Sequence, residues 1–144
     1  MKKILVIHGP NLGLLGKREP QIYGSESLDK INALISREAT SLGFNVSFMQ
    51  TNHEGIIIDA ILEAPDSIQG IIMNPGAFAH TSLAIADSIR SIDIPVVEVH
   101  LSNIFSREAM RSKMIIGKTC RGVIAGFGSR GYIMALQWFA KGRD

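Results

Sequence analysis

The chain has 144 residues, the length of one ordinary domain, and its 46% hydrophobic residues exclude a disordered segment. A formal net charge of +2, with 19% charged residues, excludes a polyanion-binding arm, so we expect no nucleic-acid partner. Cys120 is the only cysteine, and no run approaches the roughly 20 apolar residues that cross a bilayer, so we expect one cytoplasmic domain over 1–144 without a membrane partner.

Five short runs of apolar and β-branched residues predict strands. Residues 4–7 form the first, and their unbroken apolar character is typical of a strand covered on both faces of a parallel sheet. Residues 44–48 alternate apolar and polar side chains, which favours a half-covered strand at a sheet edge. The other runs are residues 70–73, 95–99 and 122–125.

Segments with helical spacing separate these strands. The clearest covers residues 28–42, where Ser27 can cap the start and Gly43 the end, and the others cover 55–64, 82–90 and 132–141. The alternation predicts an α/β fold, with a flavodoxin-like, doubly wound, five-stranded parallel sheet in the order 2-1-3-4-5. In such a sheet the ligand crevice opens where strands 1 and 3 part, beyond their carboxyl ends.

Polar residues follow strands 1, 3 and 4 and should meet at this crevice. Asparagines and histidines carry mixed donors and acceptors, which suits a small hydroxylated ligand better than a bare phosphate. Each asparagine taken alone could be a turn residue. The candidates are Asn11, Asn74, His80, Glu98, His100, Leu101 and Ser102.

Glu98 and His100 stand two residues apart on one predicted strand and therefore share a face. A carboxylate beside an imidazole fixes its tautomer and favours its protonated form, which a general acid needs. The pair could equally be a structural ion pair. His8 ends an apolar strand, and we expect it to be a buried structural residue.

The connection over residues 9–25 is longer than the about two to six residues that usually follow a strand in such folds. Because it should lie over the crevice, we interpret it as a lid. It would bring the charged and phenolic groups of Arg18, Glu19 and Tyr23 to the ligand. The alternative is a solvated surface loop.

Three motif fragments fail as cofactor or metal sites. Residues 126–131 match a dinucleotide fingerprint, but the second strand and the acidic residue about 20 positions on are missing, so we expect a strand-to-helix turn. His53-Glu54 lacks the second histidine of a zinc-protease motif, and residues 9–13 lack the ending of a phosphate loop. We therefore predict no metal and no cofactor.

Four blocks of sequence, in order, resemble the type II 3-dehydroquinate dehydratases over essentially the whole chain. They are HGPNL at 8–12, GKREPQIYG at 16–24, MNPGAFAHTS at 73–82 and EVHLSN at 98–103. Phe78, Ala79 and Phe105 depart from the family, which more often has tyrosine, threonine and histidine there. These departures leave the matched catalytic positions intact and bear on neighbouring and subunit contacts.

The resemblance implies a hydro-lyase that dehydrates 3-dehydroquinate to 3-dehydroshikimate by anti elimination through an enolate. Such an enzyme serves the shikimate pathway of aromatic amino acid biosynthesis or quinate breakdown, with no metal and no covalent intermediate. Tyr23 would be the base, held ionised by Arg18, and Asn11 would help position a water at the enolate. His100, oriented by Glu98, would protonate the departing hydroxyl. The sequence shows no obvious second cation with comparable reach to Tyr23.

The resemblance also implies how the substrate is held and how subunits assemble. Asn74, His80 and Arg111 would bind the hydroxyl and carboxylate groups of the substrate, together with backbone amides at Leu101 and Ser102. Asp87 would reach the site of a neighbouring subunit. The homo-oligomer would be a dodecamer built from trimers.

Two other classes of function remain open from the residues alone. A hydrolase would need an activated nucleophile, but Ser82 and Ser102 lack the elbow motif and Cys120 has no evident base. A flavodoxin-like binding or signalling module would bind flavin or carry an acidic cluster after strands 1 and 3, where this chain has asparagines.

Overall fold

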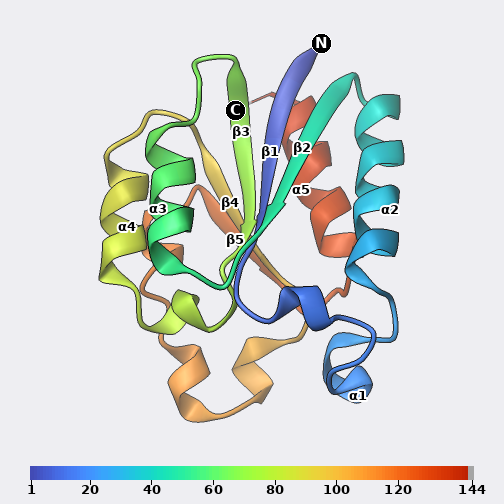
Figure 1. Cartoon of the computed structure of the whole chain (residues 1–144), viewed down its shortest axis with the longest axis vertical. Helices are drawn as coiled ribbons and strands as arrows, with labels where there is room; N and C mark the ends of the chain where they lie inside the picture. Colours follow the sequence, from blue (N-terminus) through green and yellow to red (C-terminus); the bar gives the residue numbers. More distant parts are fainter. Residues whose placement is uncertain (143–144) are drawn as a thin grey trace.

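A five-stranded parallel sheet lies between two pairs of helices in the computed structural model, which describes residues 1–142 (Figure 1). The strand order is β2-β1-β3-β4-β5, which confirms the predicted doubly wound topology. Each predicted strand is present, and most extend one or more residues beyond the predicted run. The strands are β1 (Lys2–His8), β2 (Phe44–Gln50), β3 (Ile68–Asn74), β4 (Val96–His100) and β5 (Gly122–Ala125).

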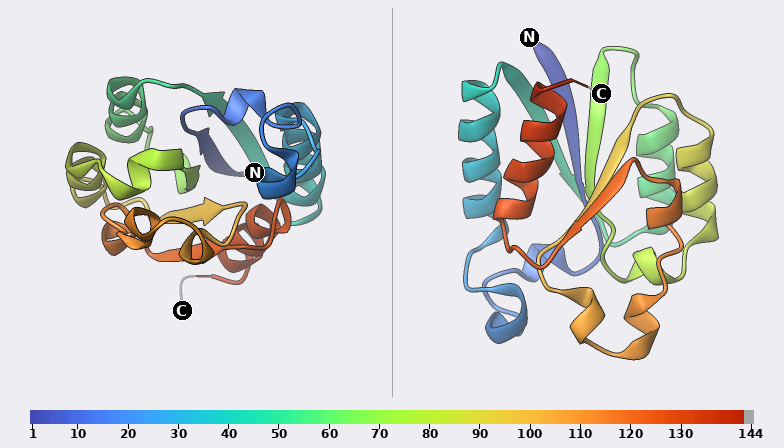
Figure 2. Two further views of the ribbon diagram at one scale, coloured as in Figure 1. Left: turned by 90° about the horizontal axis from the view of Figure 1, so that it is seen from below. Right: turned by 180° about the vertical axis from the view of Figure 1, so that it is seen from behind.

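Two apolar clusters, one on each face of the sheet, hold the helices in place. Successive residues of β1 point to opposite faces, so Val6 packs in the cluster beneath α2 (Leu28–Ser41) and α5 (Arg130–Ala140). Ile7 packs in the cluster beneath α3 (Glu54–Leu62) and α4 (Leu83–Arg90). Figure 2 shows these two helix pairs on opposite sides of the sheet. Each fully buried isoleucine contributes roughly 1.5–3 kcal/mol.

The helices begin and end close to the predicted positions. The Ser27 hydroxyl accepts a hydrogen bond from the Lys30 amide at 3.2 Å, which caps α2, and Gly43, with φ +85°, follows its end. Helix α3 ends at Leu62, two residues before the predicted end, because the residues preceding Pro65 are restricted from helical conformation.

Strand β2 lies at one edge of the sheet, as its alternating pattern predicted. Phe44 is buried, whereas the next residue is exposed, and the alternation continues as far as Phe48. Residues 126–129 form the expected turn between β5 and α5. Within the described residues no helix is long and apolar enough to span a membrane.

Short helical segments at the carboxyl end of the sheet were not predicted. Helix α1 (Pro20–Tyr23) lies in the long connection after β1, and three 3₁₀ turns lie between β4 and β5. Segments of three to five residues hold no complete amphipathic period, so hydrophobic spacing cannot reveal them. The 3₁₀ turns after β4 are η3 (Ile104–Ser106), η4 (Ala109–Ser112) and η5 (Gly117–Thr119).

His8 is buried at the end of β1, which confirms its structural interpretation. Its side chain is fully buried, and its ring stacks on Phe48 and meets Tyr132 edge-on. Burial lowers the pKa of His8 to about 4, although a hydrogen bond to Asn32 acts in the opposite direction. The neutral imidazole is therefore the form that the fold accommodates.

Acid should destabilise this fold through His8. The unfolded imidazole takes up a proton below about pH 6.5, whereas the folded one does so only near pH 4. The stabilisation is therefore complete above pH 6.5 and is lost as the pH falls toward 4. The total loss is about 3 kcal/mol in the free energy of unfolding.

Urea unfolding near pH 7 and about pH 4.5 measures this loss. We expect wild type and the variant of an exposed histidine, His53→Gln, to lose stability alike, and His8→Gln to lose clearly less. If His8→Gln and wild type lost equal stability in acid, protonation of His8 could not be the cause of the loss.

Candidate active site

A close backbone contact joins the loops that follow β1 and β3. The Gly9 amide donates a hydrogen bond to the Asn74 carbonyl at 2.8 Å. A Cβ atom on Gly9 would lie 2.7 Å from the carbonyl carbon and oxygen of Pro75, which is closer than a real side chain can approach. Gly76 has φ +59°, and a Cβ atom there would lie 3.1 Å from the Pro10 carbonyl oxygen, a tight contact. These contacts bring Asn11 and Asn74 to one pocket.

Nine of the predicted site residues line that pocket, a cavity of about 50 Å³ at the carboxyl ends of the strands. They come from the loops after β1, β3 and β4, from α1 and from η4. The sheet topology therefore collects residues that lie up to 100 positions apart in the chain. The nine are Asn11, Arg18, Tyr23, Asn74, His80, His100, Leu101, Ser102 and Arg111.

His100 lines the pocket and is backed by Glu98, which is fully buried in β4. The His100 Nε2 atom lies 2.6 Å from Glu98 Oε2, so the ring donates this N–H to the carboxylate. The Nδ1 atom is then the nitrogen that can exchange a proton within the pocket. The other carboxylate oxygen, Oε1, has no hydrogen-bond partner among the described residues. The pocket position of His100 favours the catalytic interpretation over a purely structural ion pair.

His80 presents its other nitrogen to the same pocket. Its Nδ1 atom lies 2.8 Å from the Lys113 carbonyl, which can only accept, so Nδ1 carries the proton. In the neutral ring Nε2 is therefore an acceptor. The ring stacks on that of His100 with 6.1 Å between centroids, so the two imidazoles form one wall.

Tyr23 lies close to two guanidinium groups, and only one of them was predicted. The Arg18 Cζ atom lies 5.1 Å from the centroid of the Tyr23 ring, and that of Arg107 lies 5.2 Å from it. The prediction of a single cation with this reach was therefore wrong. Arg107 lies between η3 and η4, an irregular segment without a hydrophobic period to place it. Its nearness in sequence to His100 was the signal available.

Arg18 and Arg107 differ in their surroundings. The Arg18 side chain is 37% exposed, and its Nε atom lies 3.6 Å from a Glu19 carboxylate oxygen, so Arg18 contacts both Glu19 and Tyr23. The Arg107 side chain is only 13% exposed. Solvent screens a buried charge less, but the Arg107 Nε atom also lies 4.0 Å from a Glu108 carboxylate oxygen, which offsets part of its effect on the phenol.

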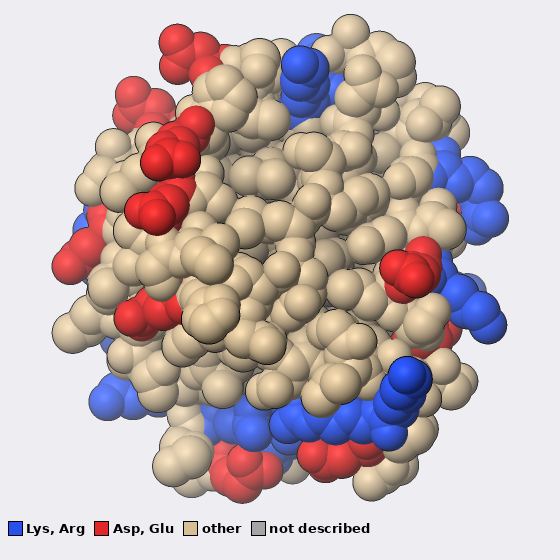
Figure 3. Space-filling model, viewed as in Figure 1, with Lys and Arg blue, Asp and Glu red and all other residues tan. Residues whose placement is uncertain are grey.

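Arg111 is held in the pocket wall by Glu108. The Arg111 Nε–H donates to a Glu108 carboxylate oxygen at 2.7 Å, and this bond lowers the pKa of the Glu108 carboxyl. In Figure 3 a band of Lys and Arg surface crosses the lower part of the molecule, with Asp and Glu patches just below it, where Figure 1 places the segment after β4. A cationic rim of this kind suits a small anionic ligand.

Asp87 lies outside this pocket. It is an exposed residue of α4, and its carboxylate accepts a hydrogen bond from Arg90 at 2.9 Å. The structure of one chain does not bring it to the site that the other predicted residues form. Its predicted contact with a neighbouring subunit stays a prediction.

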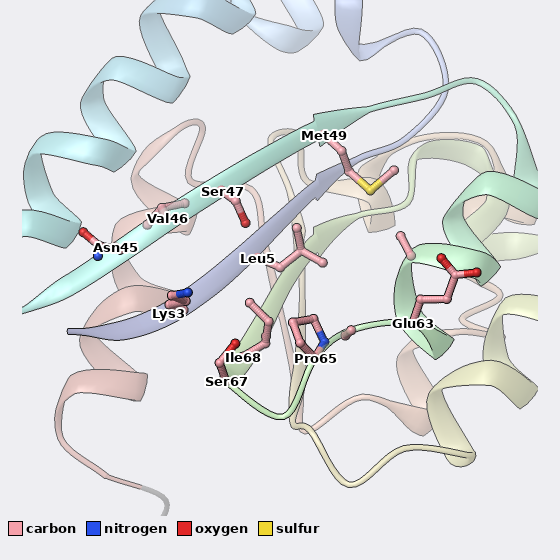
Figure 4. Close-up of a pocket in the computed structure, with 12 residues that line it drawn as sticks. Lys3, Leu5, Asn45, Val46, Ser47, Met49, Glu63, Pro65, Ser67 and Ile68 are labelled. Carbon is pink, nitrogen blue, oxygen red and sulfur yellow. The ribbon is translucent and has the colours of Figure 1, made fainter.

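A larger groove lies elsewhere, along β1, β2 and the end of α3. It has a volume of about 530 Å³, and its wall is mainly apolar, with Leu5, Met49 and Ile68 (Figure 4). Its charged residues, Lys3 and Glu63, lie at opposite ends of it in this view. Size alone therefore does not identify the site, because this groove lacks convergent titratable groups.

Cys120 offers no nucleophile in the described structure. Burial, reinforced by the charge of Glu98, raises the pKa of its thiol to about 12. Within residues 1–142 no three His, Cys, Asp or Glu side chains come close enough to form a metal site. The titratable groups that converge are those around Tyr23 and His100.

Comparison with known proteins finds close relatives over nearly the full chain. Residues 2–140 match the family model described as Dehydroquinase class II. A 3-dehydroquinate dehydratase of Trichodesmium erythraeum is 53% identical over 134 residues, covering 93% of this chain and 89% of that protein. One of Caldicellulosiruptor saccharolyticus is 54% identical and covers 94% of each chain. The crystal structure of type II dehydroquinase from Propionibacterium acnes superposes with a TM-score of 0.94 at 41% identity, covering 98% of this chain and 97% of that one.

The contact of Gly9 with Pro75 predicts a specific sensitivity to added volume. Gly9→Ala should lower the free energy of unfolding by about 1–3 kcal/mol, because backbone atoms must move apart. Gly55→Ala in α3 is the matched control, since its added Cβ meets nothing within 4 Å and should stabilise the helix by about 0.5–1 kcal/mol. Urea unfolding measures both, and a Gly9→Ala protein as stable as wild type would rule out the tight contact.

Proposed function

The chain belongs to the dehydroquinase class II family, and on that premise we propose that residues 1–144 form one 3-dehydroquinate dehydratase domain. It is a hydro-lyase that removes water from 3-dehydroquinate to give 3-dehydroshikimate. The observation that carries the proposal is one pocket that holds a tyrosine close to two arginines and a histidine backed by a buried carboxylate. These are the base and the acid that an elimination of water needs.

Tyr23 is the base. Its ionised phenolate removes the proton on the carbon beside the substrate ketone, and the electrons pass into an enolate. One positive charge at about 5 Å stabilises the phenolate by about 3 kcal/mol at an effective dielectric of about 20, before its desolvation is counted. Arg18 and Arg107 together offset more of the free-energy cost of desolvating the phenolate than Arg18 alone could.

His100 is the acid. Its protonated ring gives the Nδ1 proton to the departing hydroxyl, which leaves as water while the enolate collapses to the conjugated enone. The Glu98 carboxylate holds the Nε2–H and stabilises the charged ring before the transfer. Because Glu98 is buried, this interaction is screened little by solvent.

The remaining pocket residues hold the substrate. The Arg111 guanidinium, Asn74, His80 and the backbone amides of Leu101 and Ser102 bind its carboxylate and hydroxyl groups. Asn11 has φ +69°, a left-handed conformation that asparagine tolerates, and helps position a water at the enolate oxygen. The reaction needs no metal, no cofactor and no covalent intermediate.

In this mechanism the segment that carries Tyr23 moves as a lid during turnover. The pocket volume of about 50 Å³ is small for a six-membered ring acid, and Tyr23 and Arg18 of this segment form part of the pocket wall. Residues between η1 (Leu12–Leu14) and α2 therefore open to admit substrate and close to bring Tyr23 and Arg18 to it.

The enzyme works in the cytoplasm as a dodecamer of trimers. Asp87 is an exposed residue of α4 outside the pocket of its own chain, where it pairs with Arg90. In the trimer it would contact the substrate of a neighbouring subunit.

Formation of the conjugated enone from 3-dehydroquinate tests the proposal. Ultraviolet absorbance should rise with wild-type protein, and Tyr23→Phe and His100→Gln should each lower kcat by about a hundredfold to ten-thousandfold. Wild-type protein that forms no enone would refute the function, and a fully active Tyr23→Phe would refute the base.

Arg18 and Arg107 should share the task of stabilising the Tyr23 phenolate. Arg18→Ala and Arg107→Ala should each lower kcat by about a hundredfold, and the double variant should fall to the level of Tyr23→Phe. Arg18→Lys should recover part of the rate, since it keeps the charge and loses the planar fork. The exposed Arg37→Ala on α2 is the control and should match wild type. An unchanged kcat in Arg107→Ala would show that Arg18 alone is enough to stabilise the Tyr23 phenolate.

Glu98→Gln should lower kcat more than it changes KM. The glutamine keeps the size of the side chain but loses the negative charge that stabilises the protonated His100, so we expect kcat to fall about 10- to 100-fold and KM by less than about threefold. Glu63→Gln, in the groove away from the pocket, is the charge-matched control. An effect confined to KM would place Glu98 in substrate binding instead.

A further inference from the structure

A buried chain of hydrogen bonds leads from α2 to the pocket through residues that the proposed mechanism does not use. His8 Nε2 lies 2.8 Å from Asn32 Oδ1, and His8 Nδ1 lies 3.3 Å from the Tyr132 hydroxyl. The same hydroxyl lies 3.5 Å from Asn74 Nδ2. His8 and Tyr132 are both fully buried, so water does not compete for these groups.

The direction of each hydrogen bond follows from Asn74, the residue at which these hydrogen bonds reach the pocket. The Gly76 amide donates to Asn74 Oδ1 at 3.1 Å, so the NH₂ group of Asn74 is the end that faces Tyr132. This group can only donate, and the Tyr132 oxygen therefore accepts from it.

The Tyr132 proton must then point to His8. Among the described residues, the Nδ1 atom of His8 is the one acceptor in reach of the buried hydroxyl. If His8 carried its proton on Nδ1 instead, the Tyr132 O–H would be buried without a partner, which costs about 1–3 kcal/mol. His8 is therefore protonated on Nε2, where it donates to Asn32.

The ionisation of both groups agrees with this arrangement. Burial lowers the pKa of His8, so the ring stays neutral and keeps one nitrogen as an acceptor. Burial raises the pKa of Tyr132 well above its ordinary value, so the hydroxyl keeps its proton. The direction of donation is therefore fixed for both groups: the Tyr132 hydroxyl donates to His8, and His8 donates to Asn32.

We propose that Asn32, His8 and Tyr132 are positioning residues that fix the amide of Asn74. One Asn74 N–H is directed to Tyr132, and the second N–H is thereby presented to the pocket as a donor for a substrate oxygen. This inference rests on the proposed function, in which Asn74 binds substrate. A flipped amide would turn an oxygen toward the oxygens of the substrate and leave the Gly76 N–H without its acceptor.

Tyr132→Phe tests the hydrogen bond to Asn74, through which the hydrogen-bond chain reaches the pocket. Losing the hydroxyl should raise KM about three- to tenfold and leave kcat within about twofold, because Asn74 binds substrate rather than transfers a proton. The control is Phe139→Leu on the same helix, which removes core volume without touching a polar group and should leave KM unchanged. An unchanged KM in Tyr132→Phe would overturn the inference.

Asn32→Leu tests the end of the hydrogen-bond chain that lies outside the pocket. Without its acceptor the His8 ring can take either tautomer, so KM should rise about twofold to fivefold in the same direction as in Tyr132→Phe. The imidazole nitrogen resonances of His8 provide a readout that needs no substrate. In wild type they should show the neutral Nε2–H tautomer, and in Asn32→Leu a mixture of the two.

The outcomes separate this inference from the proposed function. Wild-type protein that forms no enone refutes the function, and the nitrogen spectrum then decides the chain of hydrogen bonds alone. An active wild type with an Nδ1–H tautomer at His8 overturns the inference and leaves the function standing. If Tyr132→Phe fails to fold, the KM of Asn32→Leu and the wild-type spectrum decide in its place.

Discussion

The backbone contact of Gly9 with Asn74 and Pro75 is the constraint on which the rest of the site depends. Only a residue without a side chain lets the loops after β1 and β3 lie this close. The contact places Asn11 from one loop and Asn74 from the other in a single pocket, at the point where the parallel sheet changes its winding direction. The chemistry of the site then comes from what β4 and the lid segment add to that framework.

Two groups of ionisable side chains line the pocket, and separate elements of the fold supply them. The lid brings Tyr23 against Arg18, and the segment after β4 brings Arg107 to the same ring. Strand β4 supplies His100 already joined to Glu98. In the proposed mechanism the groups that remove and deliver a proton are therefore held by different parts of the chain, so that movement of the lid would assemble the base without disturbing the acid.

Much of this arrangement could be predicted from the sequence, and the failures have physical causes. Apolar runs and helical spacing revealed the sheet, and the rule that ligands bind beyond strand ends placed Asn74 and His100 together. Arg107 was missed because it lies between two short 3₁₀ turns, in a segment that leaves no periodic pattern. The partner of His8 was missed because its contact with Tyr132 joins residues 124 positions apart. Asp87 stays untested because its predicted role needs a second subunit.

The stereochemistry of the elimination tests the central claim most directly, namely that a base on the lid and an acid on β4 act as separate groups. Substrate would carry deuterium at one of the two hydrogens beside the ketone, and mass spectrometry of the product would show whether it is kept. The account predicts loss of the deuterium that lies anti to the departing hydroxyl and retention of the other. Loss of the syn deuterium would contradict it, because that outcome requires removal of the proton and departure of the hydroxyl on the same face of the ring.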